Sequence, residues 1–132
     1  MLKYNLLVIE ESDPLLNELL IPTLAGAGFK VATCFNHLEA LSALDWLKPD
    51  LIVLGERPQV DSFKICSQLR QVVDIPILIL GTVPGDTAWV KAIAAGADFY
   101  LLKPFYHLEL VARVKAILRR YQWSLEEVNR NG

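Results

Sequence analysis

The fold class is most clearly indicated by the stretch "PDLIVLG", residues 49–55. Four apolar residues stand between Asp50 and Gly55, and no polar residue alternates with them. An uninterrupted apolar run of this length is typical of a strand that is buried on both faces, as the strands of parallel sheets are. The stretch therefore predicts an inner strand of a parallel sheet, ending at Gly55.

Similar runs lie on both sides of this stretch. They are "YNLLVIE" (4–10), "FKVATC" (29–34), "IPILILG" (75–81) and "DFYLL" (98–102). The segments between and after these runs have helical periodicity and capping residues. The first expected helix has Asp13 as its N-cap and ends at Gly26 or Gly28, and the second runs from Asn36 to about Leu47. Asp61 or Ser62 is the expected cap of the third helix. Asp86 is the expected cap of the fourth, which ends at Gly96, and the fifth runs from about Tyr106 to Tyr121. This alternation predicts a doubly wound α/β fold with helices on both faces of the sheet.

Composition narrows the function classes. The chain has 132 residues, a formal charge of −2 and 53% hydrophobic residues, which predict one globular domain without a nucleic-acid-binding surface. No apolar run approaches the length of a membrane span, and we expect a cytoplasmic location. Cys34 and Cys66 lack metal-ligand spacing and are interpreted as small core residues.

Polar residues follow four of the five predicted strands. Ligands of open α/β sheets bind beyond the carboxyl ends of the strands, where the strand order reverses. The residues at these ends are Glu10-Glu11, Gly55-Glu56, Gly81-Thr82 and Lys103-Pro104. Adjacent carboxylates are ligands that suit Mg²⁺. The sequence therefore places any functional site at this edge of the sheet.

Five stretches together resemble the receiver domain of response regulators: "LLVIEE", "PDLIVLG", "IPILILGT", "GADFYLLKPF" and "ELVARVKAILRR". The resemblance implies a flavodoxin-like, CheY-like fold: a five-stranded parallel sheet of order 2-1-3-4-5 with five helices. It assigns residues 1–121 to the receiver domain and leaves 122–132 as a tail or the start of a linker. The last stretch is similar to the OmpR/PhoB subfamily, whose receivers precede a winged-helix DNA-binding domain.

The same resemblance shows that the phosphorylation site is degenerate. Gly55 stands where the family has its phosphoacceptor aspartate, and Gly81 stands where it has a Ser or Thr that bonds the phosphoryl group. Lys103 matches the family's lysine, and we expect it to pair with Glu10 or Glu11. Tyr100 matches an aromatic switch residue that turns inward to follow the Ser or Thr hydroxyl, which Gly81 does not provide.

Magnesium binding is expected to be weak or absent. Glu10 and Glu11 match the family's acidic pair, but the second member is normally Asp, and Mg²⁺ tolerates a displaced carboxylate poorly. No cofactor is therefore predicted. Asp61 is interpreted as a helix N-cap, and Glu56 is expected to point to the other face or to leave the strand.

A dimer face is also implied by the OmpR/PhoB resemblance, on the fourth helix, fifth strand and fifth helix. Its members here are Trp89, Val90, Ile93, Asp98, Phe99, Glu109, Val111, Arg113 and Lys115. Trp89 and Phe99 stand where charged residues are usual, which makes this face more apolar than the family pattern. Asp98 remains as the expected partner of Arg113.

These observations predict an atypical receiver domain that acts without phosphorylation. We expect it to be the regulatory and dimerisation module of a DNA-binding transcription regulator, with no direct nucleic acid contact of its own. One alternative is a small-ligand sensor that uses the vacated phosphorylation pocket, and another is a single-domain adaptor for protein interaction. An enzyme is not expected, because no nucleophile–base pair is visible; His37 and His107 have no catalytic partners in the sequence.

Overall fold

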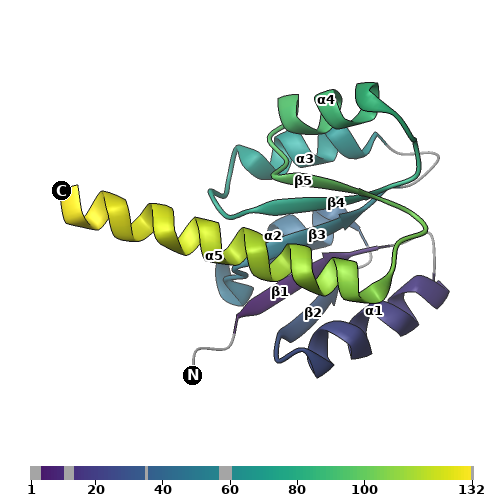
Figure 1. Ribbon diagram of the computed structural model, residues 1–132, viewed down its shortest axis with the longest axis horizontal. Coiled ribbons are helices and arrows are strands. Elements are labelled where there is room, and N and C mark those ends of the chain that lie inside the picture. Colours follow the sequence, from purple (N-terminus) through teal and green to yellow (C-terminus); the bar gives the residue numbers. More distant parts are fainter. Residues whose placement is uncertain (1–3, 11–13, 35, 57–60, 132) are drawn as a thin grey trace.

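Five parallel strands and five helices alternate along the chain, as the sequence predicts (Figure 1). The structure is a computed structural model that describes residues 4–10, 14–34, 36–56 and 61–131. The strands are β1 (Asn5–Ile9), β2 (Lys30–Cys34), β3 (Leu51–Gly55), β4 (Ile77–Gly81) and β5 (Phe99–Leu102). Their order in the sheet is β2-β1-β3-β4-β5, which confirms the flavodoxin-like topology.

The helices cover both faces of the sheet (Figure 1). They are α1 (Pro14–Gly26), α2 (His37–Leu47), α3 (Ser62–Arg70), α4 (Asp86–Ala94) and α5 (His107–Asn131). Buried residues of α1 and α5 pack with Leu6, Val53 and Leu80 on one face. Buried residues of α2, α3 and α4 pack with Leu7 and Leu54 on the other. All five residues of both β3 and β4 are buried, as the apolar runs indicate.

Local signals set most helix boundaries. Asn36 caps α2 by accepting the Glu39 amide at 2.8 Å, and Asp61 caps α3 by accepting the amides of Phe63 and Lys64, both at 3.1 Å. The prediction that Asp86 caps α4 is wrong: Gly85 holds the N-cap position without a side-chain bond, and Asp86 is the first helical residue. The expected cap at Asp13 lies outside the described residues.

The predicted end of the last helix, at Tyr121, is also wrong. α5 continues to Asn131, and its final turns extend away from the body of the domain (Figure 1). Residues 122–131 contain good helix formers and neither Gly nor Pro, so the helix meets no local stop signal before Gly132. The loss of the apolar stripe marks where α5 leaves the sheet, rather than where it ends. Within the described residues, no helix is both long and apolar enough to cross a bilayer.

Candidate functional site

The site predicted at the carboxyl edge of the sheet contains an ion pair instead of a phosphoacceptor. Gly55 ends β3, Glu10 follows β1, and Lys103 follows β5. The Lys103 Nζ atom lies 3.1 Å from Oε2 of Glu10, whose side chain is fully buried. Lys103 precedes a cis peptide bond to Pro104, which the family resemblance implies. The expected pairing of Lys103 with the acidic pair is therefore present, and Glu10 is the member that makes it.

The Glu10 carboxylate fills the space beside Gly55. A Cβ atom built on Gly55 would stand well inside 3.0 Å of Oε2 and the carboxyl carbon of Glu10, a separation that real Cβ atoms essentially never show. The glycine is therefore the residue that lets this carboxylate enter the site. The position lacks a reactive oxygen, and a side chain there would require the end of the Glu10 side chain to move.

Gly81 is filled in the same way by Tyr100. A Cβ atom on Gly81 would overlap the phenol ring and hydroxyl of Tyr100. Tyr100 is only 3% exposed, and its ring lies on the sheet face that α2, α3 and α4 cover. We call this position of the ring, packed over Gly81, the inward position. Among the described residues, a side chain from another strand therefore lies beside each of the two glycines.

Glu56 also belongs to the site, through hydrogen bonds that the sequence did not predict. Its side chain turns towards the end of β4, where Oε2 accepts the amide of Thr82, the Thr82 hydroxyl at 2.9 Å and the Tyr100 hydroxyl at 3.1 Å. Glu56 is 8% exposed. The position of Glu56 in the sequence could have indicated this contact, because Glu56 and Thr82 each follow the glycine that ends one of two paired strands.

The Tyr100 hydroxyl belongs to the same hydrogen-bond network. It accepts the Val83 amide at 3.0 Å and lies 3.1 Å from the Val83 carbonyl oxygen. Burial raises the pKa of Tyr100 above its ordinary value, and the negative charge of Glu56 acts in the same direction. The raised pKa keeps the hydroxyl protonated at neutral pH, so it donates one hydrogen bond within the network.

The described residues do not fit a magnesium ion. The family's third carboxylate is absent at Gly55, and the Glu10 carboxylate is paired with Lys103. The residues that the structure describes include no cluster of three or more His, Cys, Asp or Glu side chains suited to a metal. Glu11, the other predicted ligand, lies outside the described residues.

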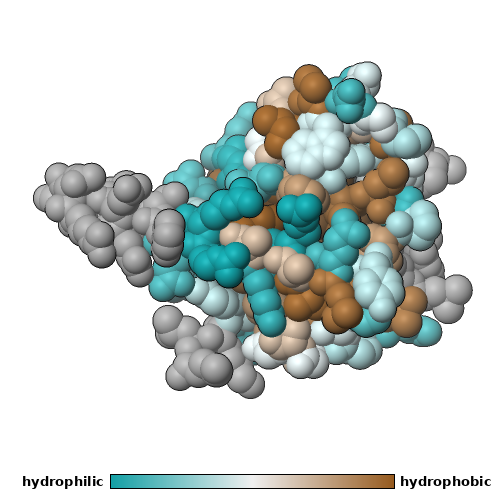
Figure 2. All heavy atoms as spheres, viewed as in Figure 1, coloured by the Kyte–Doolittle hydropathy of each residue, from teal (hydrophilic) through white to brown (hydrophobic). Residues whose placement is uncertain are grey.

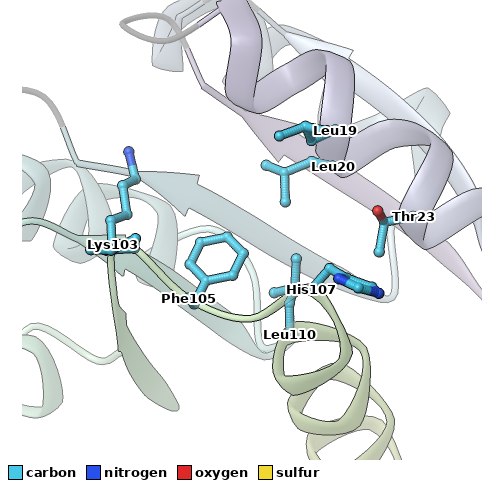
Figure 3. Close-up of a pocket in the computed structure, with 8 residues that line it drawn as sticks. Leu19, Leu20, Thr23, Lys103, Phe105, His107 and Leu110 are labelled. Atoms are coloured by element: carbon cyan, nitrogen blue, oxygen red, sulfur yellow. The ribbon is translucent and has the colours of Figure 1, made fainter.

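A pocket lies between α1 and the start of α5, and neither glycine lines it. It has a volume of about 450 Å³ and is lined by Leu19, Leu20, Thr23, Lys103, Pro104, Phe105, His107 and Leu110. Figure 3 shows the leucines of α1 facing Phe105 and Leu110 across it. The ligand-sensor hypothesis placed its cavity over the two glycines, where Glu10 and Tyr100 stand instead.

The predicted dimer face carries exposed apolar side chains. Val90 is 67% exposed and Ile93 is 49% exposed. Trp89 packs edge-on against Phe99, with ring centroids 4.9 Å apart, and the Arg113 guanidinium carbon lies 4.5 Å from the centre of the Phe99 ring. Apolar side chains gather over α4 and beside β5, whereas α5 presents many hydrophilic ones (Figure 2). An aromatic cluster with a cation–π contact thus occupies positions where the family has charged residues.

Asp98 pairs with Arg70 of the same chain, and its expected pairing with Arg113 across the dimer face stays a prediction. Its Oδ2 atom lies 3.0 Å from Nη2 of Arg70 and accepts the Ile77 amide at 2.8 Å. Arg113 instead stacks on Phe99. Within this chain, Asp98 therefore joins α3 and β4 to β5. Among the other predicted members, Glu109 and Lys115 are exposed on α5, and Val111 is half-buried.

The two histidines lie at the starts of two different helices. His107 is exposed at the start of α5, and its ring centre lies 4.8 Å from that of Tyr106. His37 is half-buried at the start of α2.

The strand order and the pairing of Lys103 with Glu10 at the carboxyl edge of the sheet are those that the receiver-domain resemblance implies. The model of the response regulator receiver domain family matches residues 6–115. The chain belongs to this family.

Relatives and solved structures agree with this assignment. The chain is 38% identical over 120 residues to the DNA-binding response regulator MtrA of Mycolicibacterium smegmatis, covering 90% of this chain and 52% of the relative. It is 36% identical over 118 residues to the DNA-binding dual master transcriptional regulator RpaA of Synechocystis, covering 86% of this chain and 49% of the relative. A crystal structure of a putative response regulator from Chloroflexus aurantiacus has a TM-score of 0.80 and 34% identity, covering 89% of this chain and 99% of that one. The chain thus spans about half the length of these curated relatives.

Proposed function

We propose that this chain is a receiver domain that works without aspartate phosphorylation, as the regulatory and dimerisation module of a DNA-binding transcription regulator. The observation that carries the proposal is the Glu10 carboxylate, which is paired with Lys103 and fills the space beside Gly55. Formation of an acyl phosphate requires a carboxylate oxygen that can attack phosphorus, and glycine has none. Glu10 cannot replace it readily, because its side chain is fully buried and its charge is already paired.

The second glycine supports the same conclusion. A receiver that responds to phosphate needs a hydroxyl at the end of β4 to bond the phosphoryl group. Gly81 has no hydroxyl, and Tyr100 occupies the volume where one would stand. Thr82 does not substitute for it, because its hydroxyl donates to Glu56. Both contacts to a phosphoryl group are therefore replaced by internal contacts.

Dimerisation is proposed to depend on apolar contact rather than on ion pairs. Val90 and Ile93 are well exposed on α4, next to the cluster of Trp89, Phe99 and Arg113. Exposed apolar surface bordered by polar residues is a feature of protein interfaces. In an ordinary receiver, phosphorylation shifts an equilibrium towards the dimer-competent state. Here the sequence itself is proposed to set that equilibrium.

The role in transcription regulation is supported by the relatives, whose names describe DNA-binding regulators about twice as long as this chain. The alternative of a single-domain adaptor would use the same exposed face to bind another protein. Sequence beyond residue 132 distinguishes the two: a winged helix favours the regulator, and a stop codon favours the adaptor.

The direct test is a titration with beryllofluoride, and separately with acetyl phosphate, in the presence of Mg²⁺. Amide chemical shifts are followed by NMR, and a receiver with an intact phosphoacceptor aspartate is titrated in parallel as the positive control. We expect no saturable shifts at Gly55, Gly81 or Lys103. Saturable shifts centred on Gly55 would contradict phosphate independence. Sedimentation without any phosphodonor tests dimerisation, and a monomer at high concentration would remove that part of the proposal.

A further inference from the structure

Glu56 is a buried carboxylate whose contacts lie on a neighbouring strand end and on β5. One of its oxygens accepts three donors, two from Thr82 and one from Tyr100. All three donors are uncharged. A buried carboxylate is costly unless its hydrogen bonds are satisfied, so removal of any of these donors makes the position of Glu56 less favourable. The carboxylate and its donors therefore fix one another.

Tyr100 is held from two sides. Its hydroxyl contacts Glu56 and the backbone of Val83, which lies in the β4–α4 loop. Its ring stacks with Phe63 of α3 at a centroid distance of 6.4 Å and an interplanar angle of 25°. Gly81 supplies the room for the ring, and Glu56 supplies the acceptor for the hydroxyl. Neither contribution depends on a phosphoryl group.

We infer that Glu56 is a positioning residue that holds Tyr100 permanently inward and fixes the β4–α4 loop from within. Its charge-assisted hydrogen bonds take the place of the contacts that a Ser or Thr at position 81 would make. The aromatic residue therefore does not respond to the phosphorylation site, and its position is set by the residue that directly follows Gly55.

The fixed position of Tyr100 also affects the proposed dimer face, because β5 carries residues of both. Phe99 and Tyr100 are adjacent in this strand and point to opposite faces of the sheet. When Tyr100 is held inward, the backbone that carries Phe99 is held as well, and with it the contacts of Phe99 to Trp89 and Arg113. The effect on the dimer face rests on the proposed function, whereas the position of Tyr100 does not.

The test compares Glu56→Ala and Glu56→Gln with the wild-type chain. Glu18→Gln, on the exposed surface of α1, is the matched control. Three readouts are used: nuclear Overhauser effects between the Tyr100 ring and Gly81, amide hydrogen exchange at Thr82 and Val83, and the ionisation of Tyr100 followed by ultraviolet absorbance, with Tyr100→Phe to identify its signal.

In Glu56→Ala we expect loss of the Tyr100–Gly81 effects and exchange at Thr82 and Val83 that is roughly tenfold faster, as the loss of about 1.4 kcal/mol of hydrogen bonding predicts. In Glu56→Gln, which keeps the side-chain volume, we expect a downward shift of the Tyr100 ionisation, because the negative charge has gone. A role in packing alone would not move that ionisation. Glu18→Gln should match the wild type in every readout.

Unchanged Tyr100–Gly81 effects and unchanged exchange in a folded Glu56→Ala chain would overturn the inference. If that variant does not fold, an unchanged Tyr100 ionisation in Glu56→Gln would overturn it. Sedimentation of the same samples separates this inference from the proposed function. If Tyr100 is inward but the chain is strictly monomeric, only the proposed dimerisation is refuted. If the chain is a dimer but the Tyr100 readouts do not change when Glu56 is substituted, only this inference is refuted.

Discussion

The carboxylate of Glu10 stands where the first side-chain atom of any residue other than glycine at position 55 would have to stand. Glu10 follows β1 and Gly55 ends the neighbouring parallel strand β3, so the two residues meet at the carboxyl edge of the sheet. The glycine leaves space at this edge, and the carboxylate of Glu10, paired with Lys103, fills it.

A side chain at position 55 should therefore be costly. We expect Gly55→Ala to lower the free energy of unfolding by about 1–3 kcal/mol, the usual cost of overpacking a buried site, because the Glu10 carboxylate must move. Urea denaturation measures the change. Gly26→Ala is the matched control, since a Cβ atom there meets nothing within 4 Å, and it should not destabilise the chain. Equal effects of the two substitutions would show that Glu10 does not constrain position 55.

Restoring the aspartate alone should not restore the switch. We expect Gly55→Asp to remain unphosphorylated by acetyl phosphate and Mg²⁺, because the new carboxylate competes with Glu10 for the same space and Gly81 still lacks a hydroxyl. Intact-mass spectrometry detects the acyl phosphate, and a receiver with its native aspartate serves as the positive control. Robust phosphorylation of the single variant would overturn our account of this site.

The pair between Lys103 and Glu10 should contribute strongly to stability. The side chain of Lys103 is 17% exposed and that of Glu10 is fully buried, so Lys103→Met would leave a buried carboxylate without its ammonium. We expect a loss of about 3 kcal/mol in the free energy of unfolding, and a smaller loss when Glu10→Gln is added. Lys64→Met, on the exposed surface of α3, is the control. A double variant that is less stable than the sum of the single effects would argue against this pairing.

The dimer face can be tested by placing a charge on it. Val90 is 67% exposed on α4, and we expect Val90→Glu to weaken self-association at least roughly tenfold, because an apolar contact is replaced by a charge that must be desolvated. Sedimentation velocity over a concentration series measures this. Leu38→Glu introduces the same change at a residue that is 68% exposed on α2, and it should have no effect. Equal weakening by both substitutions would place the interface elsewhere.

Stability should fall at alkaline pH because of Cys66. Burial raises the pKa of the Cys66 thiol from 9.0 to about 11. The unfolded thiol ionises first, so this contribution is fully present below pH 9 and is lost as the pH rises through 11. With about 1.4 kcal/mol for each pKa unit, the loss is roughly 2–3 kcal/mol. Urea denaturation from pH 8 to pH 11 should show a steeper decline for the wild type than for Cys66→Ala. Parallel declines would contradict the raised pKa.

The strands and most helix boundaries could be read from the sequence because their signals are local. The apolar run at 51–54 and the caps at Asn36 and Asp61 each act within a few residues of the chain. The strand order followed from the family resemblance. The same local reasoning failed at α5, where the apolar stripe ends before the helix does. Hydrophobic periodicity reports contact with the sheet, whereas helix propensity governs how far the helix continues.

The sequence alone also showed that Gly55 and Gly81 cannot carry phosphoryl chemistry, because glycine has no side chain in any fold. It did not show whether their sites are open or filled. That depends on which long side chains, from other strands, can reach the space: Glu10 from the end of β1 for one, and Tyr100 from β5 for the other. Nor did it show that Glu56 turns towards Thr82. These contacts join residues far apart in the chain, so packing across the sheet, rather than any local pattern, determines which side chains lie beside the two glycines.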